Sequence, residues 1–249
     1  MLLQQKVAIV TGSARGIGAA TAKLLAANGA NVVVNYVNNK DAGEKVVKEI
    51  QAAKGKAILV KADVTVREEV ENMVKTTEAE LGPIDILVNN ANMSFPIKPF
   101  VEYAWEDFER KILNEMKASF FCCKAVLPGM IERKKGRIVN VSSGLSRRPG
   151  MGFIAHSSAK SALDAFSKSL ALELGPHGIT VNVVAPGLTL TDATAHQPAE
   201  MHKAIAAQTP LRRLGLPEDI AGAVLYFCTN HSGFVTGTYL PVSGGAQMN

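Results

Sequence analysis

Short apolar runs alternate along the chain with longer stretches in which apolar residues recur at helical spacing. Seven runs are rich in valine, isoleucine and leucine, namely KVAIV at 6–10, NVVVNY at 31–36, KAILV at 56–60, IDILVNN at 84–90, GRIVNVSS at 136–143, GITVNVVAP at 178–186 and GTYLPV at 237–242. Runs of this kind between amphipathic helices are typical of a parallel sheet covered on both faces. The pattern therefore predicts an α/β fold, a doubly wound parallel sheet of about seven strands with helices on both faces.

The same pattern continues through the whole chain without a break. No internal repeat, low-complexity tract or Pro/Gly/Ser-rich linker separates one part from another, which favours a single domain over residues 1–249. The longest poorly patterned segments, 92–102 and 187–210, each follow a strand, at the edge where open α/β sheets bind ligands. We expect these loops to line a substrate pocket. Its candidate wall residues are apolar: Met93, Phe95, Phe100, Leu190 and Met201.

The net charge of +5 changes this picture little. Lysines and arginines are scattered, and their densest cluster, at 132–137, is expected to be a solvated turn, so no nucleic-acid partner is predicted. The charge favours a phosphorylated cofactor or an acyl-carrier substrate. The chain starts without a signal-peptide pattern and has no run of about 18 apolar residues, so we expect a cytoplasmic protein with no membrane partner.

The cysteines predict neither a disulfide framework nor a metal site. Cys122, Cys123 and Cys228 are odd in number, and their spacing does not fit metal ligands. With 47% hydrophobic residues, the 249-residue chain can bury a large core without cross-links. We therefore expect reduced thiols in that core.

A glycine-rich turn joins the first predicted strand to a helix. The sequence TGSARGIG at 11–18 places Gly12, Gly16 and Gly18 where the backbone must turn sharply and approach a pyrophosphate at the positive helix N-terminus. The spacing is GxxxGxG rather than GxGxxG, and a glycine-rich turn alone is equally compatible with a plain strand-to-helix turn. Its position after the first strand favours dinucleotide binding. The candidate cofactor-binding residues of this turn are Gly12, Ser13, Arg15, Gly16, Ile17 and Gly18.

The end of the second strand predicts which dinucleotide binds. An Asp or Glu there would accept a hydrogen bond from a free ribose 2′-hydroxyl, but Asn35 and Tyr36 occupy these positions and no acid appears before Asp41. Arg15 offers a guanidinium for a 2′-phosphate, although a solvent-facing arginine would fit the same pattern. The two features together favour NADP(H) over NAD(H).

A series of motifs resembles the classical short-chain dehydrogenase/reductase family, and specifically its 3-oxoacyl-(acyl carrier protein) reductase-like members. The motifs are TGSARGIG at 11–18, ADV at 62–64, VNNA at 88–91, NVSS at 140–143, APG at 185–187 and RRLGLPEDIAGAVLYF with TGTYLPVSGG towards the C-terminus. They follow the family order from residue 6 to residue 245. The resemblance implies a Rossmann-type fold and an NAD(P)-dependent oxidoreductase that converts a ketone or 3-oxoacyl group to an alcohol.

The resemblance also implies further cofactor contacts. Asp63 and Val64 would lie by the adenine ring, the segment 89–91 by the adenosine ribose, and the segment after 185 by the nicotinamide. Each of these residues has an ordinary structural explanation when taken alone, such as a strand-end cap or a turn. The implied cofactor-binding residues are Asp63, Val64, Asn89, Asn90, Ala91, Lys160, Pro186, Gly187 and Thr191.

The family performs its chemistry with an asparagine, a serine and a YxxxK pair. Asn114 and Ser143 match the first two, and Lys160 matches the lysine. His156 occupies the tyrosine position, thirteen residues after Ser143 and four before Lys160, on the same helix face as that lysine. The resemblance implies that Asn114 helps to hold a water relay, that Ser143 and His156 hydrogen-bond the carbonyl oxygen, and that Lys160 anchors the cofactor ribose.

A histidine at this position changes the expected chemistry. Burial and the neighbouring Lys160 both lower the imidazole pKa, so His156 is expected to be neutral at pH 7. Three outcomes stay open: a working reductase in which His156 or a water it holds supplies the proton, a cofactor-binding homologue with weak or no redox activity that serves as a partner protein, and an introduced substitution. Without the flanking motifs, a core histidine beside a surface lysine would be the simplest interpretation.

The chain also departs from the family pattern at two further positions, and it has one apolar stretch that bears on assembly. Asn92 replaces the glycine that usually follows VNNA, and asparagine tolerates left-handed backbone geometry. Ser243 replaces an aspartate near the C-terminus. The family usually forms tetramers through its fourth and fifth helices and its C-terminal segment, which implies a homotetramer or homodimer. The apolar stretch 118–130 fits such an interface and equally fits intramolecular core.

Overall fold

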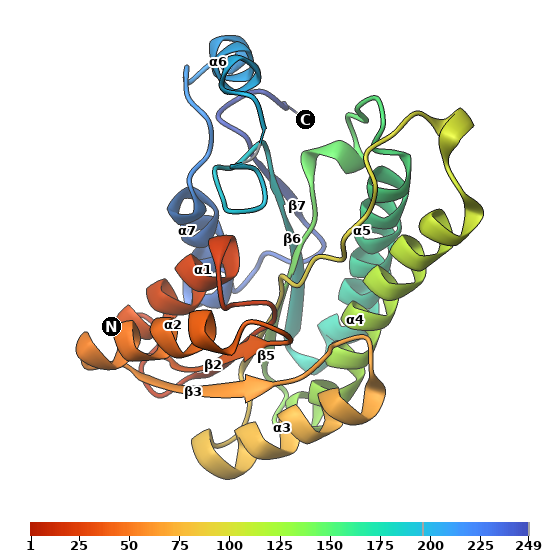
Figure 1. The fold of residues 1–249 in the computed structure, drawn as a ribbon. Coiled ribbons are helices and arrows are strands. Elements are labelled where there is room, and N and C mark those ends of the chain that lie inside the picture. Colours follow the sequence, from red (N-terminus) through yellow and green to blue (C-terminus); the bar gives the residue numbers. More distant parts are fainter. Residues whose placement is uncertain (196, 249) are drawn as a thin grey trace.

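One parallel seven-stranded sheet organises the molecule in a computed structural model that describes residues 1–195 and 197–248 (Figure 1). Residue 196, within the expected loop 187–210, and residue 249 lie outside the described residues. The strands are β1 (Val7–Val10), β2 (Asn31–Tyr36), β3 (Lys56–Lys61), β4 (Ile86–Asn89), β5 (Gly136–Val141), β6 (Ile179–Pro186) and β7 (Tyr239–Val242). Their order is β3-β2-β1-β4-β5-β6-β7, and every neighbouring pair is parallel. The predicted Rossmann-type, doubly wound sheet is confirmed.

Helices cover both faces of the sheet. They are α1 (Gly16–Ala27), α2 (Lys40–Ala52), α3 (Arg67–Leu81), α4 (Trp105–Glu132), α5 (Ile154–Leu174), α6 (Ala199–Gln208) and α7 (Pro217–Cys228), with short 3₁₀ turns η1 (Phe100–Glu102), η2 (Gly144–Ser146), η3 (Gly175–His177) and η4 (Asn230–Ser232). Helices α1, α2 and α7 pack on one face, and α3, α4 and α5 pack on the other (Figure 1).

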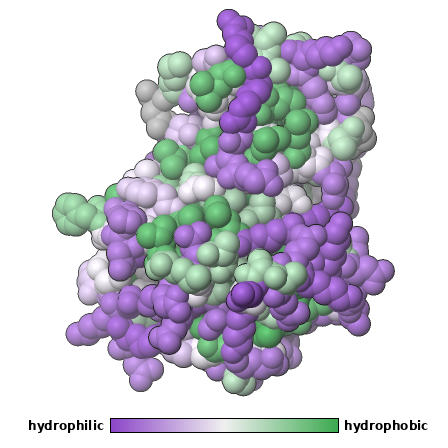
Figure 2. Space-filling model, turned by 90° about the vertical axis from the view of Figure 1, so that its left-hand side faces the viewer, coloured by the Kyte–Doolittle hydropathy of each residue, from purple (hydrophilic) through white to green (hydrophobic). Residues whose placement is uncertain are grey.

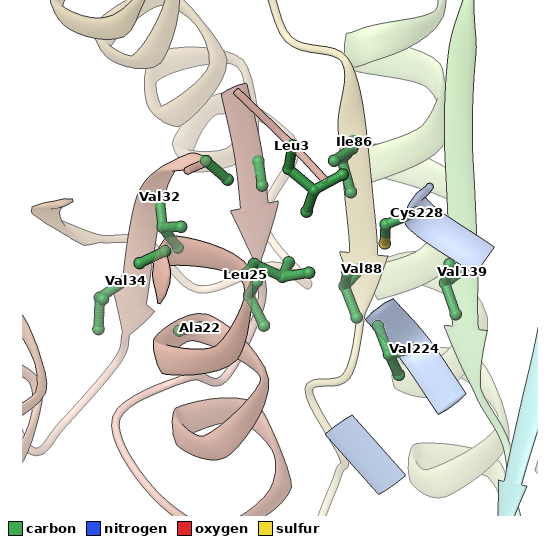
Figure 3. Close-up of a cluster of buried hydrophobic side chains, with 14 of the residues drawn as sticks. Leu3, Ala22, Leu25, Val32, Val34, Ile86, Val88, Val139, Val224 and Cys228 are labelled. Carbon is green, nitrogen blue, oxygen red and sulfur yellow. The ribbon is translucent and has the colours of Figure 1, made fainter. Parts of the chain in front are cut away.

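Alternate residues of the inner strands supply two large cores, one on each face of the sheet. In β2, Val32 and Val34 belong to the cluster under α1 and α7, while Val33 belongs to the cluster under α3, α4 and α5. Figure 3 shows the first cluster, where Leu25 of α1 and Val224 of α7 meet the strand side chains. Since both faces are covered, nearly every position of the central strands β1, β4, β5 and β6 is buried, which explains the largely apolar runs.

The chain reverses direction across the sheet between β1 and β4. From β1 the chain passes to α1 on one face, whereas β4 leads towards α4 on the other. The two connections diverge at the carboxyl edge, and the position between them, where doubly wound sheets bind ligands, is called the crevice below. The glycine-rich turn follows β1, so it lies at this crevice.

The expected loop 187–210 is only partly a loop. Its second half forms α6, a ten-residue helix with no buried residue, which stands beyond the carboxyl edge of the sheet (Figure 1). The apolar periodicity of such an exposed helix is weak, which is why the pattern missed it. Figure 2 shows the side of the molecule that lies on the left in Figure 1. Apolar surface gathers in its upper and central parts, and its lower part is more hydrophilic.

The apolar stretch 118–130 lies within α4 and contributes mainly to intramolecular core. Cys122, Cys123 and Val126 are buried in the cluster under that helix, whereas Phe120 is half exposed. The three cysteines are free and buried, and burial raises the pKa of each thiol. Among the described residues, no helix is both long and apolar enough to span a bilayer, and no group of His, Cys, Asp and Glu side chains is arranged as a metal site.

Candidate functional site

The glycine-rich turn has a shape that only glycine permits at two positions. Gly12 has a φ of +60°, and a Cβ there would lie 3.0 Å from the Cα of Ala91. A Cβ on Gly18 would lie 2.5 Å from both the Gly12 carbonyl oxygen and the Asn90 side-chain nitrogen. The turn is therefore pressed against the end of β4, and the free N–H groups at the start of α1 face the crevice.

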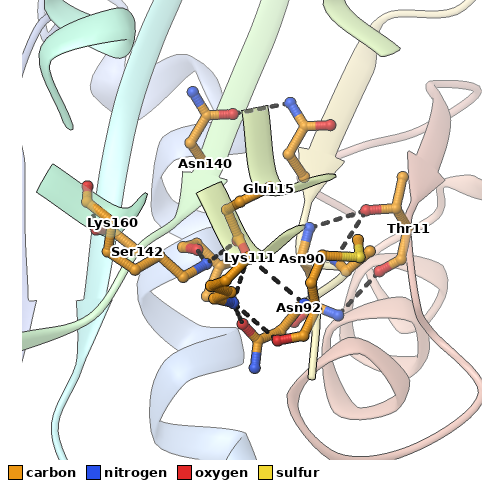
Figure 4. A network of polar contacts seen from close by, with 12 residues as sticks. Thr11, Asn90, Asn92, Lys111, Glu115, Asn140, Ser142 and Lys160 are labelled. Carbon is orange, nitrogen blue, oxygen red and sulfur yellow. Dashed lines mark hydrogen bonds and ion pairs between the residues drawn. The ribbon is translucent and has the colours of Figure 1, made fainter. Parts of the chain in front are cut away.

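Two asparagines hold this turn in place. The Asn35 side chain accepts from the Gly12 N–H at 2.9 Å and donates to the Ala62 carbonyl oxygen at 2.9 Å. The Asn90 amide donates to the carbonyl oxygen of Thr11 at 2.8 Å (Figure 4). The Asn35 side chain is buried and makes its hydrogen bonds within the protein, so it shapes the turn rather than facing the crevice.

The rim of the crevice has cationic and polar groups. Arg15 is exposed immediately before α1, and Tyr36 is half buried at the end of β2. Asp63, after β3, caps the following turn by accepting from the Thr65 N–H at 2.9 Å and from the Thr65 hydroxyl at 2.7 Å. Val64 is buried beside it.

The segment after β6 reaches the same turn. Thr191 packs against Gly16, because a Cβ on that glycine would lie 3.4 Å from the Thr191 methyl carbon. Gly187 follows Pro186 and lies so close to Ser243 that a Cβ would come within 3.1 Å of it. The structure thus brings together segments that follow β1, β4 and β6.

Three buried charged side chains form the centre of the site (Figure 4). Lys160 of α5 donates to the Val141 carbonyl oxygen at 2.8 Å and to one carboxylate oxygen of Glu115 at 2.5 Å. Lys111 donates to the other oxygen of Glu115 at 2.5 Å. The exposed fractions of Lys111, Glu115 and Lys160 are 0%, 2% and 3%. One carboxylate therefore bridges two ammonium groups out of contact with solvent.

The same Lys111 ammonium is tied to the loop after β4. It donates to the Asn92 side-chain oxygen at 2.7 Å and to the Met93 carbonyl oxygen at 2.8 Å. All three of its N–H groups therefore have acceptors. Asn92 does not adopt the left-handed backbone conformation that a glycine would allow. The residue that replaces the family's glycine serves here instead as a hydrogen-bond acceptor for Lys111.

Burial and mutual attraction set the ionisation of this bridge. Burial opposes the charge of Glu115, but Lys160 and Lys111 outweigh it and lower the pKa of the carboxyl group to about 2. Burial lowers the pKa of Lys111 to about 8, with Glu115 opposing that change. At neutral pH Glu115 is therefore expected to be ionised and Lys111 to be mostly protonated.

His156 lies one helical turn before Lys160 and is 8% exposed. Its ring stacks on Phe95 with centroids 4.7 Å apart and an interplanar angle of 17°, and its Nδ1 atom is buried without a hydrogen-bond partner among the described residues. Burial is the largest cause that lowers its pKa to about 3, and Lys160 and Lys111 add to it. The imidazole is therefore neutral across the physiological range, as the sequence led us to expect.

Ser143 lies two residues beyond β5, close along the chain to the Val141 carbonyl that holds Lys160. Its hydroxyl accepts from the Leu145 N–H at 3.2 Å, and its carbonyl accepts from the Tyr239 hydroxyl at 3.2 Å. The nearby Asn140 accepts from Asn89 at 2.8 Å inside the sheet. Asn89 thus packs into the core beneath the site rather than standing at its surface.

The structure does not bring the predicted Asn114 to Lys160. Glu115, the next residue along α4, holds that position, and Asn114 is half buried to one side. A one-residue step turns a helix by about 100°, so only one of the two can face the site. Lys111, Glu115, Ala118 and Cys122 share the buried stripe of α4, and that spacing is the signal that could have identified the two charged residues.

The expected wall residues behave differently. Phe95 reaches His156, and Met93 packs on the core below α4. Phe100, in contrast, is 70% exposed, and Leu190 and Met201 are also exposed. The structure therefore assigns a site contact to Phe95 and none to Phe100.

Comparison with known proteins finds similar proteins over nearly the whole chain. Residues 12–247 match the model of a family described as enoyl-(acyl carrier protein) reductase. A 3-oxoacyl-(acyl-carrier-protein) reductase of Synechocystis sp. is 41% identical over 249 residues, which cover 99% of this chain and 98% of the relative. The corresponding reductase FabG of Staphylococcus epidermidis is 35% identical and covers 98% of this chain and 99% of its own.

A solved structure has the same fold over nearly the whole chain. The short-chain type dehydrogenase/reductase from Mycobacterium ulcerans superposes with a TM-score of 0.93 at 29% sequence identity, covering 99% of this chain and 91% of that chain. An uncharacterized oxidoreductase of Methylorubrum extorquens is 38% identical over 252 residues, covering 98% of this chain and 99% of the relative.

Proposed function

Since this chain belongs to the short-chain dehydrogenase/reductase family and is 3-oxoacyl-(acyl carrier protein) reductase-like, we propose that it is an NADPH-dependent oxidoreductase. Its reaction is the reduction of a ketone or a 3-oxoacyl thioester to the alcohol. The observation that carries the proposal is the placement of His156 and Lys160 on one face of α5, at the same sheet edge as the glycine-rich turn.

The residues of the crevice fit a dinucleotide. The turn at 12–18 is packed too closely to accept a Cβ on Gly12 or Gly18, and the N-terminus of α1 favours a pyrophosphate there. Thr191 closes the turn from the side of β6. A nicotinamide cofactor, when bound, supplies the hydride that adds to the substrate carbonyl carbon.

Lys160 is suited to hold the nicotinamide ribose. Two of its three N–H groups are engaged, by Glu115 and by the Val141 carbonyl, which leaves one donor for a ribose hydroxyl. Because those two partners are buried, the ammonium keeps one orientation before the cofactor arrives.

His156 and Ser143 provide polar groups for the carbonyl oxygen. A neutral imidazole donates a hydrogen bond through one ring nitrogen, but it releases that proton only at high cost. A water held by His156 would therefore give the proton that completes the alcohol, and a proton from bulk solvent would neutralise the hydroxide that this leaves. The Ser143 hydroxyl is the second donor to the oxygen.

We propose NADPH rather than NADH because the binding site offers a cation, Arg15, and lacks an acid at the end of β2. Arg15 is exposed at the start of α1, and Tyr36 follows β2 where an acid would be needed for a free ribose 2′-hydroxyl. A guanidinium forms charge-assisted hydrogen bonds with a 2′-phosphate.

The assay that tests the function measures NADPH oxidation, with NADH as the alternative donor, on a short 3-oxoacyl thioester and several simple ketones. The protein is compared with its His156→Tyr variant from pH 5 to 9. Turnover by the unmodified protein, with a pH profile that changes in the variant, supports a working His156. Absence of turnover in both, despite cofactor binding, contradicts the proposal.

A second candidate is a cofactor-binding homologue without turnover. It is favoured by one observation, the Phe95 ring stacked on an imidazole whose pKa is lowered to about 3. Turnover that appears only in the His156→Tyr variant would support it, because the fold and the cofactor site would then be intact.

The proposed assembly is a homotetramer or homodimer in the cytoplasm. Phe120 on α4 and Leu172 on α5 are exposed apolar side chains on the helices that the family resemblance implies for the interface. Light scattering at several protein concentrations measures the state directly.

A further inference from the structure

The charged start of the α4 stripe is energetically unusual. From Ala118 onward the buried positions of this helix are small or apolar, but one and two turns earlier they are Glu115 and Lys111. Removing ammonium and carboxylate groups from water is costly unless their geometry is good and their hydrogen bonds are satisfied. Here each oxygen of Glu115 has its own lysine, so the pair is a built arrangement.

The arrangement joins the two ends of the site. At one end Glu115 receives Lys160, the residue proposed to hold the cofactor ribose. At the other end Lys111 binds the Met93 carbonyl, two residues before Phe95. The Lys111 ammonium also lies 5.0 Å from the centre of the Phe95 ring, whose stacking partner is His156.

Hydrogen bonds outside the bridge hold the far half of this loop. The Tyr103 hydroxyl donates to the Pro96 carbonyl at 2.9 Å, and the Lys98 N–H donates to the Gly152 carbonyl at 3.3 Å. The half that carries Asn92 and Met93 is held by the bridge itself: Lys111 donates to both residues, and the Met93 N–H donates to Glu115 at 3.5 Å.

On the premise of the reductase function, we propose that Glu115 and Lys111 are positioning residues: one carboxylate orients Lys160 at the cofactor end and, through Lys111, fixes the Phe95 segment over His156 at the substrate end. Neither residue touches the reacting atoms. Of the two residues, only Glu115 contacts Lys160, which also donates to the Val141 carbonyl, whereas the Phe95 segment depends on both.

This difference predicts a pH effect at one end only. Lys111 faces the charged groups Glu115 on α4 and Lys160 on α5, the neutral imidazole of His156, and the uncharged acceptors of Asn92 and Met93 in the loop. With its pKa lowered to about 8, Lys111 loses its charge as the solution becomes alkaline, while Glu115 keeps Lys160. The substrate end should therefore loosen above pH 8, and the cofactor end should not.

The test uses variants that separate the two ends. Lys111→Met removes the lysine's two hydrogen bonds to the loop and leaves Glu115 with Lys160. The double variant Lys111→Met/Glu115→Gln also removes the carboxylate but keeps the net charge of the site at +1 and nearly the same volumes. Lys117→Met, on the exposed side of the same helix, is the matched control.

Two readouts do not require turnover. Fluorescence titration with NADPH measures cofactor affinity, and NMR of the His156 ring protons measures the ring-current shift caused by Phe95. In the unmodified protein the shift should diminish between pH 7 and 9.5 while the NADPH dissociation constant stays the same. Lys111→Met should show the diminished shift at every pH, with NADPH affinity within about threefold of the original, since Lys160 keeps its charged hydrogen bond.

The double variant should in addition bind NADPH about 10- to 100-fold more weakly, because a charged hydrogen bond to Lys160 has been replaced by a neutral one. A 10-fold or larger rise in substrate KM without a change in kcat is expected for Lys111→Met wherever turnover is measurable. Lys111→Arg, which keeps a charge that can pair with Glu115, should partly restore the shift.

Three results would overturn the proposal. They are a His156 signal that is independent of pH and identical in Lys111→Met, an equal loss of NADPH affinity in the single and double variants, and an unchanged NADPH affinity in a folded double variant. If the variants do not fold, the pH series on the unmodified protein still decides. Lack of turnover with every carbonyl compound would contradict the reductase function alone, because the NMR and fluorescence measurements are independent of it.

Discussion

The glycine-rich turn and the reaction end of the site are built from opposite kinds of interaction. Around the turn, neutral amides such as Asn35 and Asn90 bond to backbone groups. At the reaction end, charged side chains bond to one another, with Glu115 between two lysines. A neutral network fixes a shape that is the same at every pH, whereas a charged one couples shape to protonation and makes each member indispensable to the others.

The largest effect on stability should come from Glu115→Gln, which replaces one carboxylate oxygen of the charged network with an amide nitrogen. Glu115→Gln leaves the Lys111 and Lys160 ammonium groups buried together without a counter-charge, so the free energy of unfolding should fall by about 3–5 kcal/mol. Urea denaturation at pH 7 measures it. Glu109→Gln, at an exposed position of the same helix, should change it by less than about 0.5 kcal/mol. Equal effects of the two substitutions would show that the bridge does not stabilise the fold.

The next effect distinguishes the two regions by pH. The pKa of His156 is lowered to about 3 in the folded protein, so between pH 6.5 and 3 the unfolded chain binds a proton that the folded chain does not. Stability is thus fully present above pH 6.5 and declines as the pH falls, by about 2–3 kcal/mol at pH 4.5. Glu115, with its pKa lowered to about 2, adds to the loss only below about pH 4.5.

Urea denaturation at pH 7 and at pH 4.5 measures this loss. His156→Gln should remove most of it, and His231→Gln, at an exposed position, should leave it in place. A pH dependence that survives in His156→Gln would mean that the imidazole does not remain neutral in the folded protein.

The smallest effect tests the neutral region. A methyl group on Gly18 would overlap the Gly12 carbonyl oxygen and the Asn90 amide, so Gly18→Ala should destabilise the protein by about 1–3 kcal/mol at every pH and weaken NADPH binding. Gly222→Ala in α7, where nothing lies within 4 Å of an added Cβ, should be neutral or slightly stabilising. The His156 NMR signal should be the same in both variants. A changed signal in Gly18→Ala would show that the two regions are not independent.

The two regions also differ in how far the sequence predicted them. Glycine spacing after an apolar strand is a local pattern with a direct steric reason, and the structure puts Gly12 and Gly18 in the tight turn that it predicts. The charged bridge joins residues 45 positions apart, and neither Lys111 nor Glu115 belongs to a motif that we used. Matching the family's asparagine to the neighbouring Asn114 missed the bridge by one residue, and the helical stripe of α4 was the signal overlooked.

The sequence by itself determined the doubly wound sheet, the glycine-rich turn after the first strand, and the pairing of His156 with Lys160 on one helix face. These follow from periodicity and spacing, which act along the chain. Only the tertiary structure decided that Glu115 faces Lys160, that Lys111 holds the loop after β4, and that Phe95 covers His156. Those contacts join segments remote in sequence, and buried charges choose partners by three-dimensional geometry, which a linear pattern does not contain.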